Sequence, residues 1–279
     1  MTNDATESRS RSEQGPVSTA KASPLDAVRA FGVMLGPSLL LDLFMGGSVV
    51  ATAMGKLAQP PRTRAAGLLR PLVALGDAAL ALYLLVVRPW MLRWGATDED
   101  LRKPLPGDDL VPDPLTTSTR AITVNAPVEA VWPWLAQIGQ DRGGMYSYEW
   151  LENLAGCQMR NADRIHPEWQ HRAIGEVVKL HPALGMPVVA FEPNRALVLQ
   201  GWGAFVVEPL DAQRTRVLLR SHTPRGWGAL YSLLFIELPH FLMERKMLLG
   251  LKERAERAWA SRDGAETAPV GDCATFASP

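Results

Sequence analysis

The stretch TRAITVNAPVEAVWPWLAQIGQDRGGMYSYEWLENL, residues 119–154, decides the fold of this chain. It opens with Ile122 and Val124 alternating with smaller or polar residues, a pattern typical of a half-buried strand. Asn125 and Pro127 are residue types that begin helices. Apolar side chains then recur at helical spacing, at Val128, Val131, Trp132, Leu135 and Ile138. The stretch therefore predicts a strand that leads directly into a helix with one buried face.

A glycine-rich bend follows this helix. Gly139 is expected to end the helix, and residues 141–144 (DRGG) are expected to form a loop. Residues 145–154 predict a second short helix, which carries Tyr146, Tyr148 and Trp150.

Residues 122–154 also resemble the opening of the SRPBCC, or START-like, superfamily, which includes polyketide cyclase-like proteins and lipid-transfer domains. The run WLxQIGQxRxGxYSYxWLxN, residues 134–153, resembles one bacterial subgroup. Further similar segments are residues 97–114, 175–178 and 243–256, so the resemblance covers roughly Thr97 to Trp259. It implies a helix-grip fold, in which a curved antiparallel sheet wraps a long C-terminal helix. It implies no established reaction.

The later pattern agrees with that architecture. Strands are predicted at residues 174–180, 187–192, 196–202, 204–208 and 215–222. The short links between them carry turn residues, so neighbouring strands must be antiparallel. A long helical region is predicted from Gly226, with a kink or restart at Pro239, and residues 241–259 have one apolar and one charged face. The fold class is therefore α+β, with an apolar cavity expected between sheet and helix.

Two apolar runs precede this domain. Residues 31–54 are mainly apolar over 24 residues, and residues 72–87 form a shorter run. About 20 such residues cross a bilayer, so the runs predict a transmembrane helical hairpin. Asp42 and Asp77 interrupt the runs, and we expect each carboxyl group to face the other helix.

Basic residues near the helix ends predict the orientation of this hairpin. Six lie on its outer flanks and four in its loop, which favours both termini and the folded domain in the cytoplasm, at the cell membrane. The flanking residues are Lys21, Arg29, Arg88, Arg93, Arg102 and Lys103; the loop residues are Lys56, Arg62, Arg64 and Arg70.

The predicted organisation has five parts. Residues 1–24 form a polar, disordered tail and residues 25–94 the membrane hairpin. Residues 95–118, rich in proline and acidic residues, form a linker that runs over a surface between membrane and domain. Residues 119–260 form the helix-grip domain and residues 261–279 a second tail.

Composition and motifs exclude several classes of function. The 29 basic and 29 acidic residues leave no electrostatic footprint for nucleic acid. The two cysteines, Cys157 and Cys273, indicate neither a disulfide framework nor a metal site. HExxH, paired CxxC, GxSxG, P-loop and Rossmann motifs are absent from the sequence. Glu149, His166, His222 and Glu237 are acid–base candidates that no spacing distinguishes, so we predict no metal, no cofactor and no assigned catalytic residue.

Ten residues are candidates for ligand contact. Trp202, Phe205, Trp227, Phe235 and Met243 are candidates to line an apolar pocket, although aromatic residues at such spacings more often belong to the core. Arg142, Tyr146 and Tyr148 lie at the glycine-rich bend, near the expected cavity mouth. Arg220 and His222 alternate on one strand and therefore share a face of the sheet. If that face is the concave one, they are polar groups inside the pocket.

Three functions fit these features. The first is a membrane-tethered module that binds a hydrophobic small molecule or lipid. The second is an enzyme of the polyketide cyclase or dehydratase kind, in which Tyr148, Arg220 and His222 orient and protonate a substrate. The third is a structural or regulatory membrane protein whose interior is filled by its own side chains. Cavity volume and the convergence of polar groups distinguish them.

Overall fold

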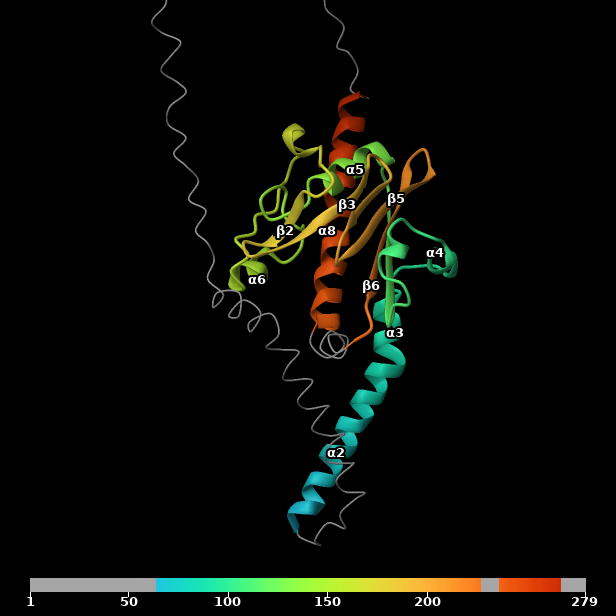
Figure 1. Ribbon diagram of the computed structural model, residues 1–279, viewed down its shortest axis with the longest axis vertical. Coiled ribbons are helices and arrows are strands. Elements are labelled where there is room, and N and C mark those ends of the chain that lie inside the picture. Colours follow the sequence, from blue (N-terminus) through green and yellow to red (C-terminus); the bar gives the residue numbers. More distant parts are fainter. Residues whose placement is uncertain (1–63, 227–235, 267–279) are drawn as a thin grey trace, which may run out of the picture.

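The computed structural model describes residues 64–226 and 236–266 (Figure 1). The N-terminal tail, the first apolar run, Trp227, Phe235 and the C-terminal tail from residue 267 lie outside the described residues. So do residues 227–235, the first part of the last helical region predicted from Gly226.

The described chain begins with a helical rod that projects from the domain (Figure 1). It consists of α2 (Arg64–Leu82), a π-helical turn (Tyr83–Val87) and α3 (Arg88–Leu92). The amide of Arg88 donates to the carbonyl of Tyr83, which is the π-helical spacing. The next residue, Pro89, has no amide hydrogen and disfavours regular α-helical bonding at this turn.

Ala74–Leu92 is the single helix of the described residues with the length and composition to cross a membrane. It has 19 residues, is predominantly apolar, and is only 11% buried within the structure. Two such helices were predicted, and the first run, residues 31–54, is outside the described part.

The domain is an α+β fold built on a six-stranded antiparallel sheet among the described residues. In the order β1-β6-β5-β4-β3-β2, its strands are Thr116–Val124, Arg214–Thr223, Gly203–Asp211, Ala196–Leu199, Leu184–Glu192 and Val177–His181. The last helix, α8 (Glu237–Glu266), lies across the sheet (Figure 1). This arrangement is consistent with the predicted helix-grip fold.

Two short helices complete the concave side. In α5 (Val128–Ala136) the side chains of Val131, Trp134 and Leu135 are buried in the main core between sheet and helices. The second helix, α6 (Glu149–Leu154), begins four residues later than predicted. Tyr146 has a φ of 55°, a left-handed conformation that a helix does not accept, so residues 145–148 continue the irregular bend and the helix begins after them.

Strand ends also differ from the sequence prediction at glycines. The predicted strand 196–202 ends at Leu199, because Gly201, with a φ of 82°, lies in the β4–β5 turn, and Gly203, with a φ of 147°, begins β5. The predicted strand 174–180 begins only at Val177, after Gly175 with φ 85°.

The predicted linker packs on the convex face of the sheet. It contains α4 (Asp98–Arg102) and a 3₁₀ turn (Asp108–Leu110), and β1 already begins at Thr116. Thr97 and Asp100 form a capping box at the start of α4. Leu105 is buried there in a small second core with Val198 and Leu218.

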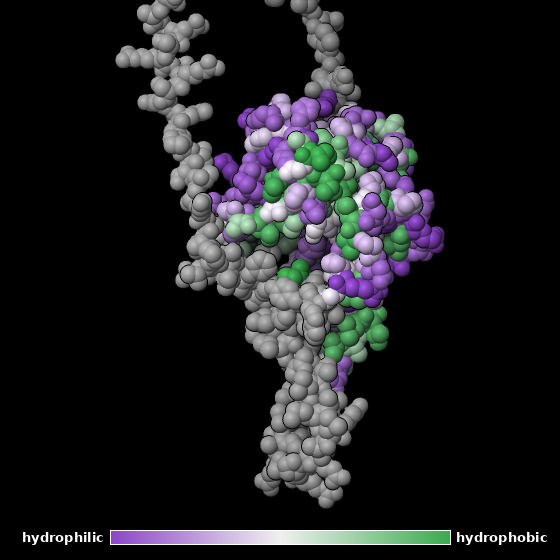
Figure 2. All heavy atoms as spheres, in the orientation of Figure 1, coloured by the Kyte–Doolittle hydropathy of each residue, from purple (hydrophilic) through white to green (hydrophobic). Residues whose placement is uncertain are grey.

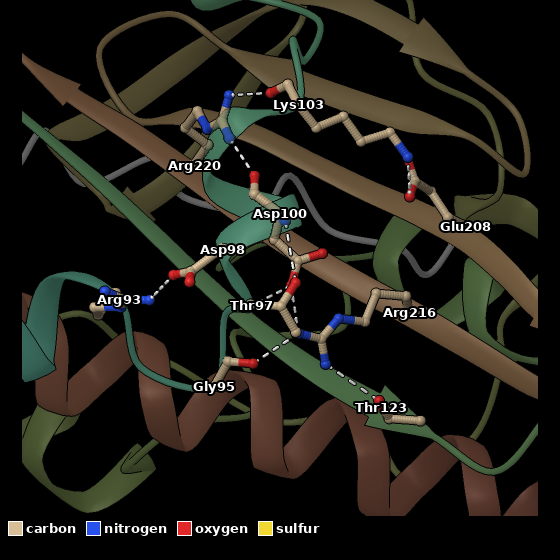
Figure 3. A network of polar contacts seen from close by, with 10 residues as sticks. All are labelled: Arg93, Gly95, Thr97, Asp98, Asp100, Lys103, Thr123, Glu208, Arg216 and Arg220. Carbon is tan, nitrogen blue, oxygen red and sulfur yellow. Dashed lines mark hydrogen bonds and ion pairs between the residues drawn. The ribbon is translucent and has the colours of Figure 1, made fainter.

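Arginines of β6 hold this segment in place (Figure 3). Arg216 donates to the Asp100 carboxylate at 2.5 Å and to the Gly95 carbonyl at 2.6 Å. Arg220 donates to the Asp100 carbonyl at 2.6 Å and to the Lys103 carbonyl at 2.7 Å. Residues 95–110 therefore form a layer of the domain that is hydrogen-bonded to the convex face of the sheet.

Candidate functional site: a cavity between the sheet and the last helix

A cavity of about 830 Å³ lies between the sheet and the first half of α8. Its wall comes from the β2–β3 and β4–β5 turns, the start of β1, the end of β6, and α6 with the loop after it. Met145, Met159, Met186, Met243 and Met247 line it, together with Leu92, Leu180 and Leu184. Methionine side chains are flexible and polarisable, so this surface can adapt to ligands of differing shape.

One wall carries a buried ion pair. The side chains of Arg120 on β1 and Glu244 on α8 are each 1% exposed and bond to each other. Trp202 donates its indole N–H to Glu244 Oε1 at 2.7 Å, and His240 Nε2 lies 3.0 Å from the same oxygen. Burial lowers the pKa of Arg120 to about 10, which still leaves it charged at neutral pH. Glu244 thus has a partner at both oxygens, as a buried carboxylate requires.

The same wall is joined to the helical rod. Arg120 Nε donates to the Met91 carbonyl at 3.1 Å, and the Arg120 guanidinium lies over the Phe241 ring. Arg88 Nε lies 2.9 Å from Glu237 Oε1, and Arg88 also donates to Thr116 Oγ1 at 3.0 Å. Glu237, Thr116 and Leu92 line the cavity. One end of the cavity therefore lies directly at the junction with the rod.

Among the described carboxyl groups of the cavity wall, Glu152 is the one with no cation beside it, whereas Glu237 lies beside Arg88 and Glu244 beside Arg120. Its side chain is 4% exposed, and its Oε2 atom is buried without a hydrogen-bond partner in the described structure. Burial, together with the charge of Glu149, raises the pKa of Glu152 to about 7. Glu152 also contributes to the cavity wall, and no described cation balances its charge. It was not predicted from the sequence, because nothing in EWLEN indicates that Glu152 faces a cavity.

Cys157 and His181 also line the cavity. Burial and the charge of Glu152 raise the pKa of the Cys157 thiol to about 11, so this cysteine is a neutral thiol. His181 is buried, and its Nδ1 accepts the Ala183 amide at 3.0 Å.

Of the ten predicted contact residues, three contribute to the cavity wall: Trp202, His222 and Met243. The imidazole of His222 is nevertheless bonded on the convex face, with Nε2 3.0 Å from Asp108 Oδ1 and Nδ1 3.0 Å from Thr117 Oγ1. Arg220 lies on the same face and donates to Asp108 Oδ2 at 2.8 Å. The two residues share a face, and it is the face that holds the 95–110 layer.

The structure places four others away from the cavity wall. Arg142 donates to the carbonyls of Trp169 and His171 and pairs with Glu176. Phe205 is fully buried in the main core. Tyr148 lies under Lys246. Tyr146 is buried, and its hydroxyl donates to the Trp134 carbonyl at 2.9 Å.

The acid–base candidates from the sequence do not converge on one point either. Glu149 accepts the Asn161 amide, and His166 stacks on Trp169 beside Glu168. Glu237 does line the cavity, and burial raises its pKa although Arg88 and Arg120 act against the rise. Within the described ranges, no group of three or more His, Cys, Asp or Glu side chains has the arrangement of a metal site.

Comparison with protein-family models and with curated proteins gave no match. The chain is similar to the solution NMR structure of the polyketide-cyclase-like protein Cgl2372 from Corynebacterium glutamicum. The two are 18% identical, the match covers 56% of this chain and 96% of that protein, and the TM-score is 0.28. The fold assignment rests on the strand order and on the position of α8 across the sheet.

Proposed function

We propose that this protein binds a hydrophobic small molecule or lipid in the cavity between α8 and the sheet, and that its helical rod holds it at a membrane. The observation that carries the proposal is the cavity. Its volume of about 830 Å³ is within the range of small-molecule sites, and its wall combines methionine and leucine side chains with a few polar groups.

The surface of the rod supports the membrane attachment. Leu75, Leu82, Leu85 and Val86 are exposed, and Trp90 is exposed close to the domain. Contiguous exposed apolar surface of this kind is favourable in lipid and unfavourable in water. Trp90 near the domain suits a membrane–water interface.

The other two functions have less support. The enzyme hypothesis relies on Tyr148, Arg220 and His222. Arg220 and His222 both bond to Asp108 on the convex face, and Tyr148 lies apart from them, under Lys246. A purely structural protein requires an interior filled by its own side chains, and a cavity of about 830 Å³ argues against it.

Native mass spectrometry of the full chain in detergent tests the binding function. We expect a co-purifying small molecule and binding of the fluorescent apolar probe 1-N-phenylnaphthylamine. Met243→Trp, which fills the cavity, should weaken probe binding about tenfold or more. Leu242→Trp is the matched control, because Leu242 is the exposed neighbour on the same helix. An empty protein that also fails to bind the probe would contradict the proposal.

A further inference from the structure

The cavity-lining carboxyl groups of the described residues differ in whether they have a cationic partner. Glu244 pairs with Arg120, and Glu237 pairs with Arg88. Arg225, also at the cavity wall, is bonded to Asp113. Glu152 alone among these carboxyl groups has no cation beside it in the described structure.

We infer that Glu152 binds a positively charged head group, and that the ligand is therefore a lipophilic amine whose apolar part occupies the methionine-lined cavity. This inference rests on the proposed function and specifies the ligand class of the same site.

The electrostatic balance of the wall favours a cation. Three carboxyl groups line the cavity against Arg120 and Arg225, both already paired. Glu149, on the same short helix as Glu152, adds further negative charge. An anionic head group, such as a fatty acid carboxylate, would meet repulsion at Glu152.

The geometry also favours one compact donor group. A buried carboxylate without a counter-ion is costly, and a primary ammonium supplies three N–H donors as well as the missing charge. Two polar atoms of the cavity wall are already engaged elsewhere, because Ser147 Oγ donates to the Met243 carbonyl and His181 Nδ1 accepts the Ala183 backbone N–H. Met145, Met159 and Met247 then leave apolar surface for the remainder of the ligand.

Displacement of 1-N-phenylnaphthylamine from the full chain in detergent at pH 8 tests this inference. The competitors are octylamine and octanol, which share a chain length and differ in charge. We expect octylamine to displace the probe at about tenfold lower concentration than octanol, and Glu152→Gln to abolish the difference. Measuring both variants in the same micelles cancels the partitioning of the competitors into detergent.

The pH dependence gives a second readout. With a pKa of about 7 for Glu152, the carboxylate fraction increases about tenfold from pH 6 to pH 8, and the octylamine affinity should increase with it. Octanol should show no such increase. Glu149→Gln is the matched control at pH 8, because Glu149 carries the same charge on α6 but does not line the cavity.

Three results would overturn the inference. Equal displacement by octanol and octylamine would remove the need for a charged head group. Retention of the amine preference in Glu152→Gln would place the head group elsewhere, and an affinity that falls as pH rises would show that the neutral acid donates to a ligand oxygen. In each of these results the probe still binds, so the proposed function survives. Absence of probe binding to every variant would overturn both.

Discussion

Arg120 and Glu152 are both buried ionisable residues of the cavity wall, and their surroundings give them different roles. Arg120 has a bonded partner in Glu244, a hydrogen bond to the Met91 carbonyl and a ring beneath its guanidinium. These contacts satisfy the charge, so Arg120 stabilises the junction of β1, α8 and the rod. Glu152 has none of these compensations, which is why we assign binding to it.

The isolated burial of Glu152 predicts a pH-dependent stability. The folded protein holds the proton more tightly than the unfolded chain, with a pKa of about 7 against 4.5. Protonation of Glu152 therefore stabilises the folded state. This stabilisation is fully present below pH 4.5 and is lost as the pH rises through about 7. The full effect is about 3 kcal/mol. Unfolding of the full chain in detergent at pH 5 and pH 8 should show this loss, and Glu152→Gln should not.

An identical pH dependence in wild type and Glu152→Gln would show that the carboxyl group has a partner in the folded protein. Added octylamine should reduce the loss at pH 8, because the ligand supplies the missing counter-charge.

For single residues, the sequence predicts which side chains share a face but not which groups they contact. The alternation of Arg220 and His222 places them on one face, and both do reach Asp108. Which face is concave depends on how the sheet lies against α8, and strand alternation does not contain that information. Glu152 was missed for the same reason, since its isolation arises only when residues distant in the chain surround it.

Among the helices, strands and loops, α8 and the glycine-rich bend pack against each other at one close contact. Gly250 lies against Tyr146, and a Cβ added to Gly250 would overlap the Tyr146 carbonyl oxygen. The bend is held there by the Asn161 side chain, which accepts the Tyr146 amide at 2.6 Å, and by Arg254 over the tyrosine ring. The left-handed backbone of Tyr146 is maintained by these surroundings.

This contact predicts the effect of Gly250→Ala. In a solvent-exposed helix the change from glycine to alanine usually stabilises by about 1 kcal/mol. Here it should destabilise by about 1–3 kcal/mol, because the added methyl group pushes α8 away from the bend. Thermal unfolding of the full chain measures the effect. Arg262→Ala, at an exposed position of the same helix, should change stability by less than about 0.5 kcal/mol, and a stabilised Gly250→Ala would refute the close contact.

Most of the helices and strands could be predicted from the spacing of apolar residues, but their first and last residues could not. Periodicity identified α5 and the later strands, because one buried face imposes a regular spacing. The glycines at 201 and 203 ended β4 earlier than the apolar pattern suggested. Residues 95–118 contain prolines and acidic residues typical of a linker, yet arginines of β6, more than a hundred residues away, bond them to the sheet. Contacts between residues so far apart in the chain cannot be recognised from the local sequence.

For the whole molecule, the rod and the cavity meet at one end. Arg88 joins the rod to both β1 and α8, and Leu92 lines the cavity. Hydrophobic residues gather where the rod leaves the domain, whereas hydrophilic residues cover much of the domain face shown in Figure 2. A domain at the membrane surface with its cavity beside the rod would exchange an apolar ligand with the bilayer over a short path. That geometry is the reason we join binding and tethering in one proposal.

The proposed membrane attachment leads to a topology prediction. Six basic residues lie on the outer flanks of the predicted hairpin and four lie in its loop. Both termini should therefore lie in the cytoplasm, and the loop between the two apolar runs should lie on the opposite side. Green fluorescent protein fused after Pro279 should fluoresce in a bacterial host, and alkaline phosphatase at that site should be inactive. Alkaline phosphatase inserted after Gln59, between the two apolar runs, should be active, and the protein should resist extraction from membranes by alkaline carbonate. Active phosphatase after Pro279 would reverse the orientation, and extraction by carbonate would refute spanning. Exchange of Arg93 and Arg102 for glutamine is the matched variant. It removes the excess of two basic residues on the flanks, so it should weaken the orientation preference.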